Sequence, residues 1–193
     1  GYAHRIEASL DQQGRVTSWT HKVVGGSARG PGGGGGLRNL QYQVPHIKSS
    51  NVPVDTIPTR PWRSPGGSHF GFTVESFMDE LAHAADIDPY EFRLKLLKKS
   101  PRHVGVLELA AEKAGWGKKL DKGRGRGIAV HKSFGSWAAH VAEVTVNSDG
   151  NFSVDRIVCA IDCGLAVHPD GVRMQMESSI VFGLTSTLKG EIT

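Results

Sequence analysis

One cation, Arg63, stands just before an expected helix, where a charged side chain and bare backbone could act together on an anion or a polarised oxygen. Gly66 and Gly67 follow it, and apolar side chains then recur at helical spacing between residues 70 and 85. Glycines leave the first backbone N–H groups of a helix uncovered, and a helix N-terminus attracts negative charge. The pattern indicates an arginine-bearing helix mouth, although an ordinary helix start beside a surface arginine has the same spacing.

The cysteines and histidines do not favour metal binding. Cys159, Cys163 and His168 are the candidate ligands, but three ligands do not complete a tetrahedral site, and zinc sites usually repeat a two-residue cysteine spacing. Positions 159 and 163 share one face of an expected strand, which is typical of core cysteines. Neither a nucleophile elbow nor a His-Glu-x-x-His motif occurs. Only one histidine, His69, lies close to Arg63 in the sequence, and we predict no metal site.

Two further stretches have ordinary interpretations. Residues 25–36 are mostly glycine, but they lack the Gly-Lys-Ser/Thr ending and the following helix of a phosphate-binding P-loop, so we expect a mobile surface loop. Glu75, Asp79 and Glu80 lie about one turn apart on the expected helix 70–86, which is typical of a solvated face.

The elements that must position Arg63 form an α+β pattern, in which helices pack with small mixed or antiparallel sheets. We divide the chain into a hairpin and extended segment over 1–60, a helical segment over 61–117, and a sheet with a final helix over 118–193. The expected elements are a β-hairpin over 4–24, helices from about 70, 88 and 100, strands between 127 and 162, and a helix after 168.

Two local patterns make sharper predictions. Asp88 is expected to cap the second helix, because a proline at the first helical position and a glutamate at the third follow it. In residues 137–147 strand alternation predicts one apolar face, whose members are His140, Ala142, Val144 and Val146.

Composition restricts the class of protein. The chain has 193 residues, of which 38% are hydrophobic and 22% charged, and these values are typical of a globular domain. The net charge is +4, but the densest basic cluster, residues 118–126, has no aromatic residues among its charges, so we expect no nucleic-acid partner. No apolar run approaches 18 residues, which predicts no membrane-spanning segment. Both ends are expected to be cut from a longer chain.

Two ordered blocks of residues carry a resemblance to a known family. The first block joins the arginine loop to the two helices after it, and the second joins the expected sheet to the last helix. The blocks are Arg63-Ser64-Pro65-Gly66-Gly67, residues 75–82 and 88–93, and then Val141-Ala142-Glu143-Val144, Gly150, Asp162-Cys163-Gly164, Pro169, Gln175-Met176-Glu177 and Gly183-Leu184. They resemble the molybdopterin-binding large subunit of the xanthine dehydrogenase family, and most closely the isoquinoline 1-oxidoreductase beta subunit and bacterial aldehyde dehydrogenases.

The resemblance implies that the chain is a fragment of a molybdenum-cofactor-binding domain in an oxidoreductase. Members of this family hydroxylate an aldehyde or the carbon beside a ring nitrogen, take the oxygen from water, and pass two electrons to a [2Fe–2S] small subunit. The implied cofactor is molybdenum with molybdopterin cytosine dinucleotide, which carries the redox chemistry while the protein orients and polarises. A periplasmic location is in keeping with the resemblance.

The resemblance also implies roles for single residues. Arg63 is the implied catalytic residue, which polarises substrate or stabilises developing negative charge. The implied cofactor-binding residues are Trp62, Ser64, Gly66, Gly67 and Gln175, and no residue is implied as a metal ligand.

The sequence departs from the family pattern at three places. Ser178 and Ser179 stand where the family has two glycines. The Gly-Gln-Gly cofactor segment is absent, and so is the C-terminal family motif whose glutamate acts as the general base. These 193 residues alone are therefore expected to be inactive. The alternative hypothesis is a non-catalytic scaffold or interaction domain that kept the fold and lost the site.

Overall fold

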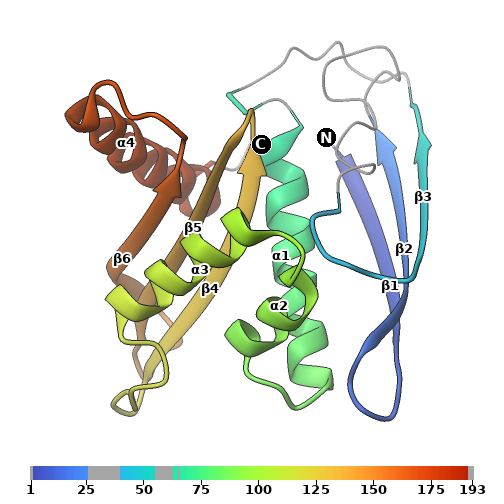
Figure 1. Ribbon diagram of the computed structural model, residues 1–193. Coiled ribbons are helices and arrows are strands. Elements are labelled where there is room, and N and C mark those ends of the chain that lie inside the picture. The colour runs from blue at the N-terminus through green and yellow to red at the C-terminus, as the bar shows by residue number, and fades with distance from the viewer. Residues whose placement is uncertain (1, 26–39, 55–62, 65, 191–193) are drawn as a thin grey trace.

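The computed structural model describes residues 2–25, 40–54, 63–64 and 66–190. Two three-stranded sheets stand apart with helices between and around them, so the expected α+β class is confirmed (Figure 1). The elements are β1 (Tyr2–Leu10), β2 (Val16–Gly25), β3 (His46–Val52), α1 (Gly67–Ala84), α2 (Pro89–Leu97), α3 (Pro101–Ala114), β4 (Arg124–Ser133), β5 (Ser136–Val146), β6 (Phe152–Asp162) and α4 (Pro169–Leu188). Most of the expected glycine loop lies outside the described residues.

The first sheet is mixed and has the order β1-β2-β3. β1 and β2 form the expected hairpin, whose turn is fixed by Asp11 because its carboxylate accepts hydrogen bonds from the amides of Gln13 and Arg15. β3 pairs parallel to β2, although the sequence indicated only an extended segment there. Proline positions around 44–53 predicted extended backbone but not a pairing partner.

The second sheet is an antiparallel meander with the order β4-β5-β6. The buried side chains of β5 are Ala139, Val141 and Glu143. The sequence predicted that the other face, with His140, Ala142, Val144 and Val146, is the apolar one, and this prediction was wrong. The reason is that α3 packs against the face of β5 that carries Ala139 and Val141. Which face of a strand is buried depends on the side that a helix covers.

The helices begin and end largely where the sequence predicts. Asp88 caps α2, because its carboxylate accepts hydrogen bonds from the amides of Tyr90 and Glu91. Pro101 opens α3 and Gly115 ends it in the left-handed conformation, with its amide bonded back to the last turn. None of the described helices is long and apolar enough to cross a membrane.

One hydrophobic core joins the helices to both sheets. Its fully buried apolar side chains include Trp19 of β2, Met78 of α1, Phe92 of α2, Leu107 of α3 and Val141 of β5. α1 runs between the two sheets and contacts both β1 and β4 (Figure 1). The N-terminal end of α1 is therefore held from two sides.

A buried ionic network corrects one prediction made for α1. Glu75, which was expected on a solvated face, is 6% exposed, and Arg93 of α2 is fully buried. The Arg93 guanidinium donates to the Glu75 carboxylate at 2.9 Å and to Asp79 at 2.6 Å. The acidic spacing on α1 thus belongs to a helix–helix contact, since buried charges are retained where they are paired.

Candidate functional site

The start of α1 is shaped by a tight backbone turn. Ser64 and Gly66 both have left-handed backbone, with φ of 59° and 75°. The Ser64 carbonyl accepts hydrogen bonds from the amides of Gly67 at 2.9 Å and Ser68 at 3.3 Å, so these two N–H groups are less bare than the sequence indicated. A Cβ on Gly67 would lie 2.6 Å from the Ser64 hydroxyl. Gly66 is therefore required by its left-handed backbone, and a side chain at position 67 would displace the Ser64 hydroxyl.

Arg63 and Gln175, two of the predicted site residues, lie together. The Arg63 guanidinium donates to the Gln175 side-chain oxygen at 2.9 Å, across 112 residues of sequence. The same guanidinium lies over the ring of Phe182, 5.7 Å from its centre. Arg63 is exposed, so its remaining N–H groups are open to a ligand. Trp62, also predicted for this site, lies outside the described residues.

α1 approaches β4 closely at its first two turns. Positions for a Cβ on Gly67 and Gly71 would lie 3.7 Å and 3.6 Å from ring atoms of His131, so this ring packs on the helix where side chains are missing. Burial lowers the pKa of His131, which keeps the ring neutral. The mouth of α1 is thus supported on one side by a rigid strand.

Three histidines on the other side of α1 form a chain that the sequence analysis missed. His4 Nδ1 lies 2.9 Å from His21 Nε2, and His4 Nε2 lies 3.0 Å from His69 Nδ1. The Tyr2 ring stacks on His69 at 4.2 Å between centres. Burial, followed by the neighbouring histidines, lowers the pKa of His21 and of His69 to about 4. The hairpin register could have revealed the first pair, since positions 4 and 21 are diagonal neighbours across β1 and β2.

The chain of rings leaves one buried nitrogen without a partner. His69 Nε2 has no hydrogen-bond partner among the described residues. A buried polar atom without a partner costs free energy and marks a place for a further polar group. The exposed Arg63 cation beside the glycine turn suits an anionic or strongly polar ligand, and His69 Nε2, in the first turn of α1, has a hydrogen bond left to make. No group of three or more His, Cys, Asp or Glu in the described part of the chain is arranged to hold a metal ion directly.

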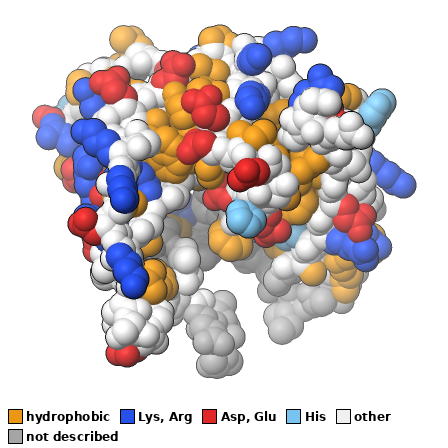
Figure 2. All heavy atoms as spheres, turned by 90° about the horizontal axis from the view of Figure 1, so that it is seen from below, with side chains coloured by type: hydrophobic (Ala, Val, Ile, Leu, Met, Phe, Trp, Pro, Cys, Tyr) orange, Lys and Arg blue, Asp and Glu red, His pale blue; other side chains and the backbone are white. Residues whose placement is uncertain are grey.

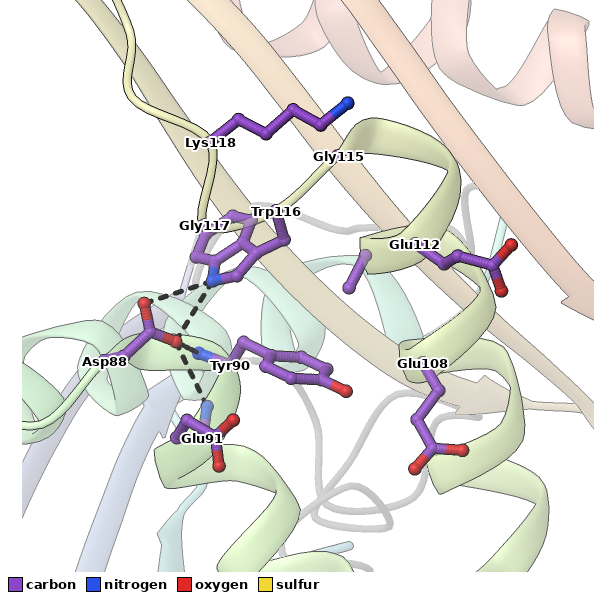
Figure 3. A pocket seen from close by; sticks show the side chains of 10 residues that line it. Asp88, Tyr90, Glu91, Glu108, Glu112, Gly115, Trp116, Gly117 and Lys118 are labelled. Carbon is purple, nitrogen blue, oxygen red and sulfur yellow. Dashed lines mark hydrogen bonds between the residues drawn. The ribbon is translucent and has the colours of Figure 1, made fainter.

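A separate hollow of about 690 Å³ lies at the opposite end of α1 (Figure 3). Four carboxylates line it, of which Asp88 is already engaged with the indole N–H of Trp116 and two backbone amides. α1 has 18 residues and is therefore about 27 Å long, which separates this hollow from Arg63. Its negative lining does not suit an anionic cofactor, so we do not assign the site to it.

The outer face near this end carries both signs of charge. Figure 2 shows acidic side chains among hydrophobic ones in the middle of the face, with lysines and arginines mostly around its margin. Arg124 and Arg126 of the basic cluster face Glu143, to which Arg126 donates at 3.0 Å. This pairing reduces the positive field that a nucleic acid would need.

Comparison with known proteins gives the family. Two family models, each described as a molybdopterin cofactor-binding domain, match residues 2–97 and 78–193 and so span nearly the whole chain. The chain belongs to this family. It is a molybdenum-binding subunit of the xanthine dehydrogenase type, as the resemblance indicated, and membership supports a molybdenum–molybdopterin cofactor. The two matches overlap at the C-terminal half of α1 and in α2, between the arginine turn and the second sheet.

The individual relatives are longer than this chain. A nicotinate dehydrogenase subunit of Pseudomonas putida is 36% identical in an alignment of 140 residues, and this alignment covers 63% of this chain and 12% of that protein. The beta subunit of isoquinoline 1-oxidoreductase of Brevundimonas diminuta is 37% identical in an alignment of 131 residues, and this alignment covers 65% of this chain and 17% of that protein. The chain thus spans less than a fifth of either relative.

A solved structure agrees on the fold. Quinoline 2-oxidoreductase from Pseudomonas putida 86 superposes with a TM-score of 0.54 over 79% of this chain and 26% of that one, at 14% sequence identity. At this identity the likeness concerns the arrangement of helices and strands alone.

Proposed function

We propose that these residues form part of the large subunit of a molybdenum hydroxylase, which oxidises an aldehyde or an N-heterocycle with oxygen from water. The observation that carries the proposal is the contact of Arg63 with Gln175 at the glycine turn, in a chain spanned by two molybdopterin cofactor-binding matches. Both residues come from the blocks that carry the family resemblance. The 193 residues alone are proposed to be inactive, because the family's general-base motif does not occur in them.

The residues at the mouth of α1 have distinct proposed tasks. Ser64, Gly66 and Gly67 offer backbone at close range and hold the cofactor, with Trp62 and Gln175 beside them. When bound, the molybdenum–pterin group supplies the two-electron acceptor. Arg63 presents a fixed cation that polarises a substrate oxygen, and Gln175 orients the guanidinium through its side-chain oxygen.

The finer parts of the proposal concern cofactor form and partner. The pterin is proposed to be the cytosine dinucleotide, and the electrons are proposed to leave to a [2Fe–2S] small subunit. Support for these comes from the family membership and from relatives whose names describe subunits of dehydrogenases and oxidoreductases. Aldehydes and N-heterocycles both remain open as substrate, because pocket shape decides between them.

A non-catalytic scaffold is the second candidate function. Ser178 and Ser179 favour it, since they replace the two glycines of the family helix. Ser178 is exposed, and the Ser179 hydroxyl donates to the carbonyl of Met176 at 2.8 Å. In this form the helix keeps its own hydrogen bonds and has side chains where the family has bare backbone.

The test is made on the full polypeptide that contains these residues. Molybdenum content is measured first, and about one metal per chain is expected. Arg63→Ala is then expected to lower kcat/KM about 100-fold or more, since loss of one preorganised donor costs about that much. Arg173→Ala is the matched control, because Arg173 is also exposed and its one ion pair among the described residues is with Asp170 on its own helix. Protein without molybdenum, or full activity in Arg63→Ala, would overturn the proposal, and the first result would favour the scaffold.

A further inference from the structure

One side of α4 exposes a continuous row of side chains with regular spacing. Met174, Ser178, Val181, Thr185 and Leu188 follow one another by alternate steps of four and three residues, and we call them the α4 seam. All five are exposed, and the three apolar ones are 59%, 64% and 46% exposed. Alternate steps of four and three are the spacing with which one helix packs along another.

α4 is only partly covered by the rest of the described chain. It lies beside β6 at the margin of the molecule (Figure 1), and none of its residues, all of which the structure describes, is buried. A helix of 20 residues usually owes its stability to a packed apolar face rather than to intrinsic propensity. The seam is the side of α4 on which apolar side chains stay exposed.

The seam is also less polar than its residue types indicate. The Thr185 hydroxyl donates to the carbonyl of Val181 at 2.8 Å and is satisfied within the helix. Thr187 and Ser186 do the same with carbonyls one turn earlier. No charged residue occurs between positions 178 and 188. The seam therefore suits an apolar helix surface with small side chains.

We propose that the α4 seam docks a helix of the same polypeptide, from outside these 193 residues. The inference rests on the proposed function, because it takes the chain as part of a large subunit. The seam spans 14 residue steps, about 21 Å, and one helix diameter of about 10 Å, so it covers on the order of 200 Å². Stable complexes between separate proteins bury about 800 Å² on each partner.

A helix of the same polypeptide can dock on the seam although the contact area is far smaller than that between separate proteins. Segments of one chain meet at an effective concentration in the millimolar range, so a small contact is enough. The matched stretches make up 12% and 17% of two relatives, so most of their polypeptide lies outside the part that aligns. A helix from that remainder is the occupant to which the proposal commits.

Two other occupants fit the seam less well. In an antiparallel pair of two copies centred on Val181, Arg173 would face Lys189 of the other copy, which is a like-charge contact. A membrane surface is bound by helices with many basic residues on their polar face, and these are the only two cations on or next to α4. Both become outcomes of the test.

The test measures how fast a maleimide labels single sites in the full polypeptide, with peptide mapping to separate the native cysteines. Val181→Cys reports the seam. Thr187→Cys is the matched control, since both native residues are β-branched and exposed, and position 187 lies about 120° around the helix from position 181. Val181→Cys is expected to react at least tenfold more slowly in folded than in denatured protein. For Thr187→Cys, the labelling rate is expected to differ less between the folded and the denatured protein.

Each alternative result overturns the proposal. Equal labelling of Val181→Cys in folded and denatured protein means an open seam. Protection that disappears on dilution favours a second copy, and protection that needs anionic vesicles favours a membrane. Hydrogen exchange of residues 174–188 in unmodified protein repeats the test without a variant. Labelling does not depend on molybdenum or turnover, so the seam result and the result for Arg63→Ala can fail separately.

Discussion

Replacing Glu75 by alanine removes the acceptor on which four donors from three parts of the chain converge. One carboxylate oxygen accepts from the Gln41 amide at 2.9 Å and the Tyr42 hydroxyl at 2.7 Å, and the other accepts from Arg93 at 2.9 Å and the backbone amide of Val130 at 3.0 Å. These donors belong to the segment before β3, to α2 and to β4. Glu75 therefore connects the segment before β3, α2 and the second sheet to α1 through one buried group.

The expected loss follows from the charge that is left behind. In Glu75→Ala, the fully buried Arg93 keeps Asp79 as its only carboxylate among the described residues. Removing one partner of a buried ion pair costs about 3–5 kcal/mol, and domains are stable by about 5–15 kcal/mol. We expect the free energy of unfolding to fall by about 4 kcal/mol. Four charge-assisted bonds added separately would exceed this figure, but such terms are not additive.

Urea unfolding followed by circular dichroism measures this loss as a lower midpoint at unchanged slope. Glu80→Ala is the matched control, because Glu80 is an exposed glutamate on the same helix, and its change is expected within about 0.5 kcal/mol. Equal midpoints for the two variants would refute the reasoning. The double variant Glu75→Leu with Arg93→Met removes both charges, and recovery of most of the loss would show that the unpaired cation causes it.

Two further predictions concern the mouth of α1 and the histidine chain. Gly66→Ala is expected to lower the free energy of unfolding by about 1–2 kcal/mol, because the φ of Gly66 is 75° and left-handed. Gly105→Ala, inside α3 with open space around it, is expected to raise the free energy of unfolding by up to about 1 kcal/mol. Shifts of opposite sign in the urea midpoint would confirm both. Lowering the pH from 7 to 4 is expected to cost about 2 kcal/mol after allowance for solvent screening, because the pKa values of His21 and His69 are about 4 when folded and 6.5 otherwise, so the unfolded chain binds protons first. His69→Gln should flatten this pH dependence of the melting temperature, and an unchanged slope would contradict the assignment.

Helix boundaries were predictable because their causes are local. Asp88 lies two and three residues from the amides it caps, and Gly115 ends α3 through its own backbone. The family blocks could also be recognised from the sequence, because residue order and spacing can be compared without any knowledge of packing. Arg63 and Gln175 were both found in this way, but their hydrogen bond was not, since 112 residues separate them.

Burial could not be predicted where long-range packing reverses a local pattern. Glu75 and Arg93 read as solvated by residue type, and only the approach of α2 to α1 makes each the other's partner. The buried face of β5 depends on which side α3 covers, and one apolar alternation fits either side. His4 and His69 meet across 65 residues, so a prediction from spacing had no signal for that contact.

The geometry of the candidate site depends on what holds α4. The bond between Arg63 and Gln175 is exposed at the Arg63 end, and a hydrogen bond of this kind contributes about 0.5–1.5 kcal/mol, which is too little to fix a 20-residue helix. α1, by contrast, is held by the core, the Glu75 network and the close contact with His131. The backbone next to Arg63 is thus held by α1, whereas the position of Gln175 depends on where α4 lies. Whatever packs on the α4 seam therefore also determines how Gln175 meets Arg63, and this links the docking of that helix to the proposed chemistry at the mouth of α1.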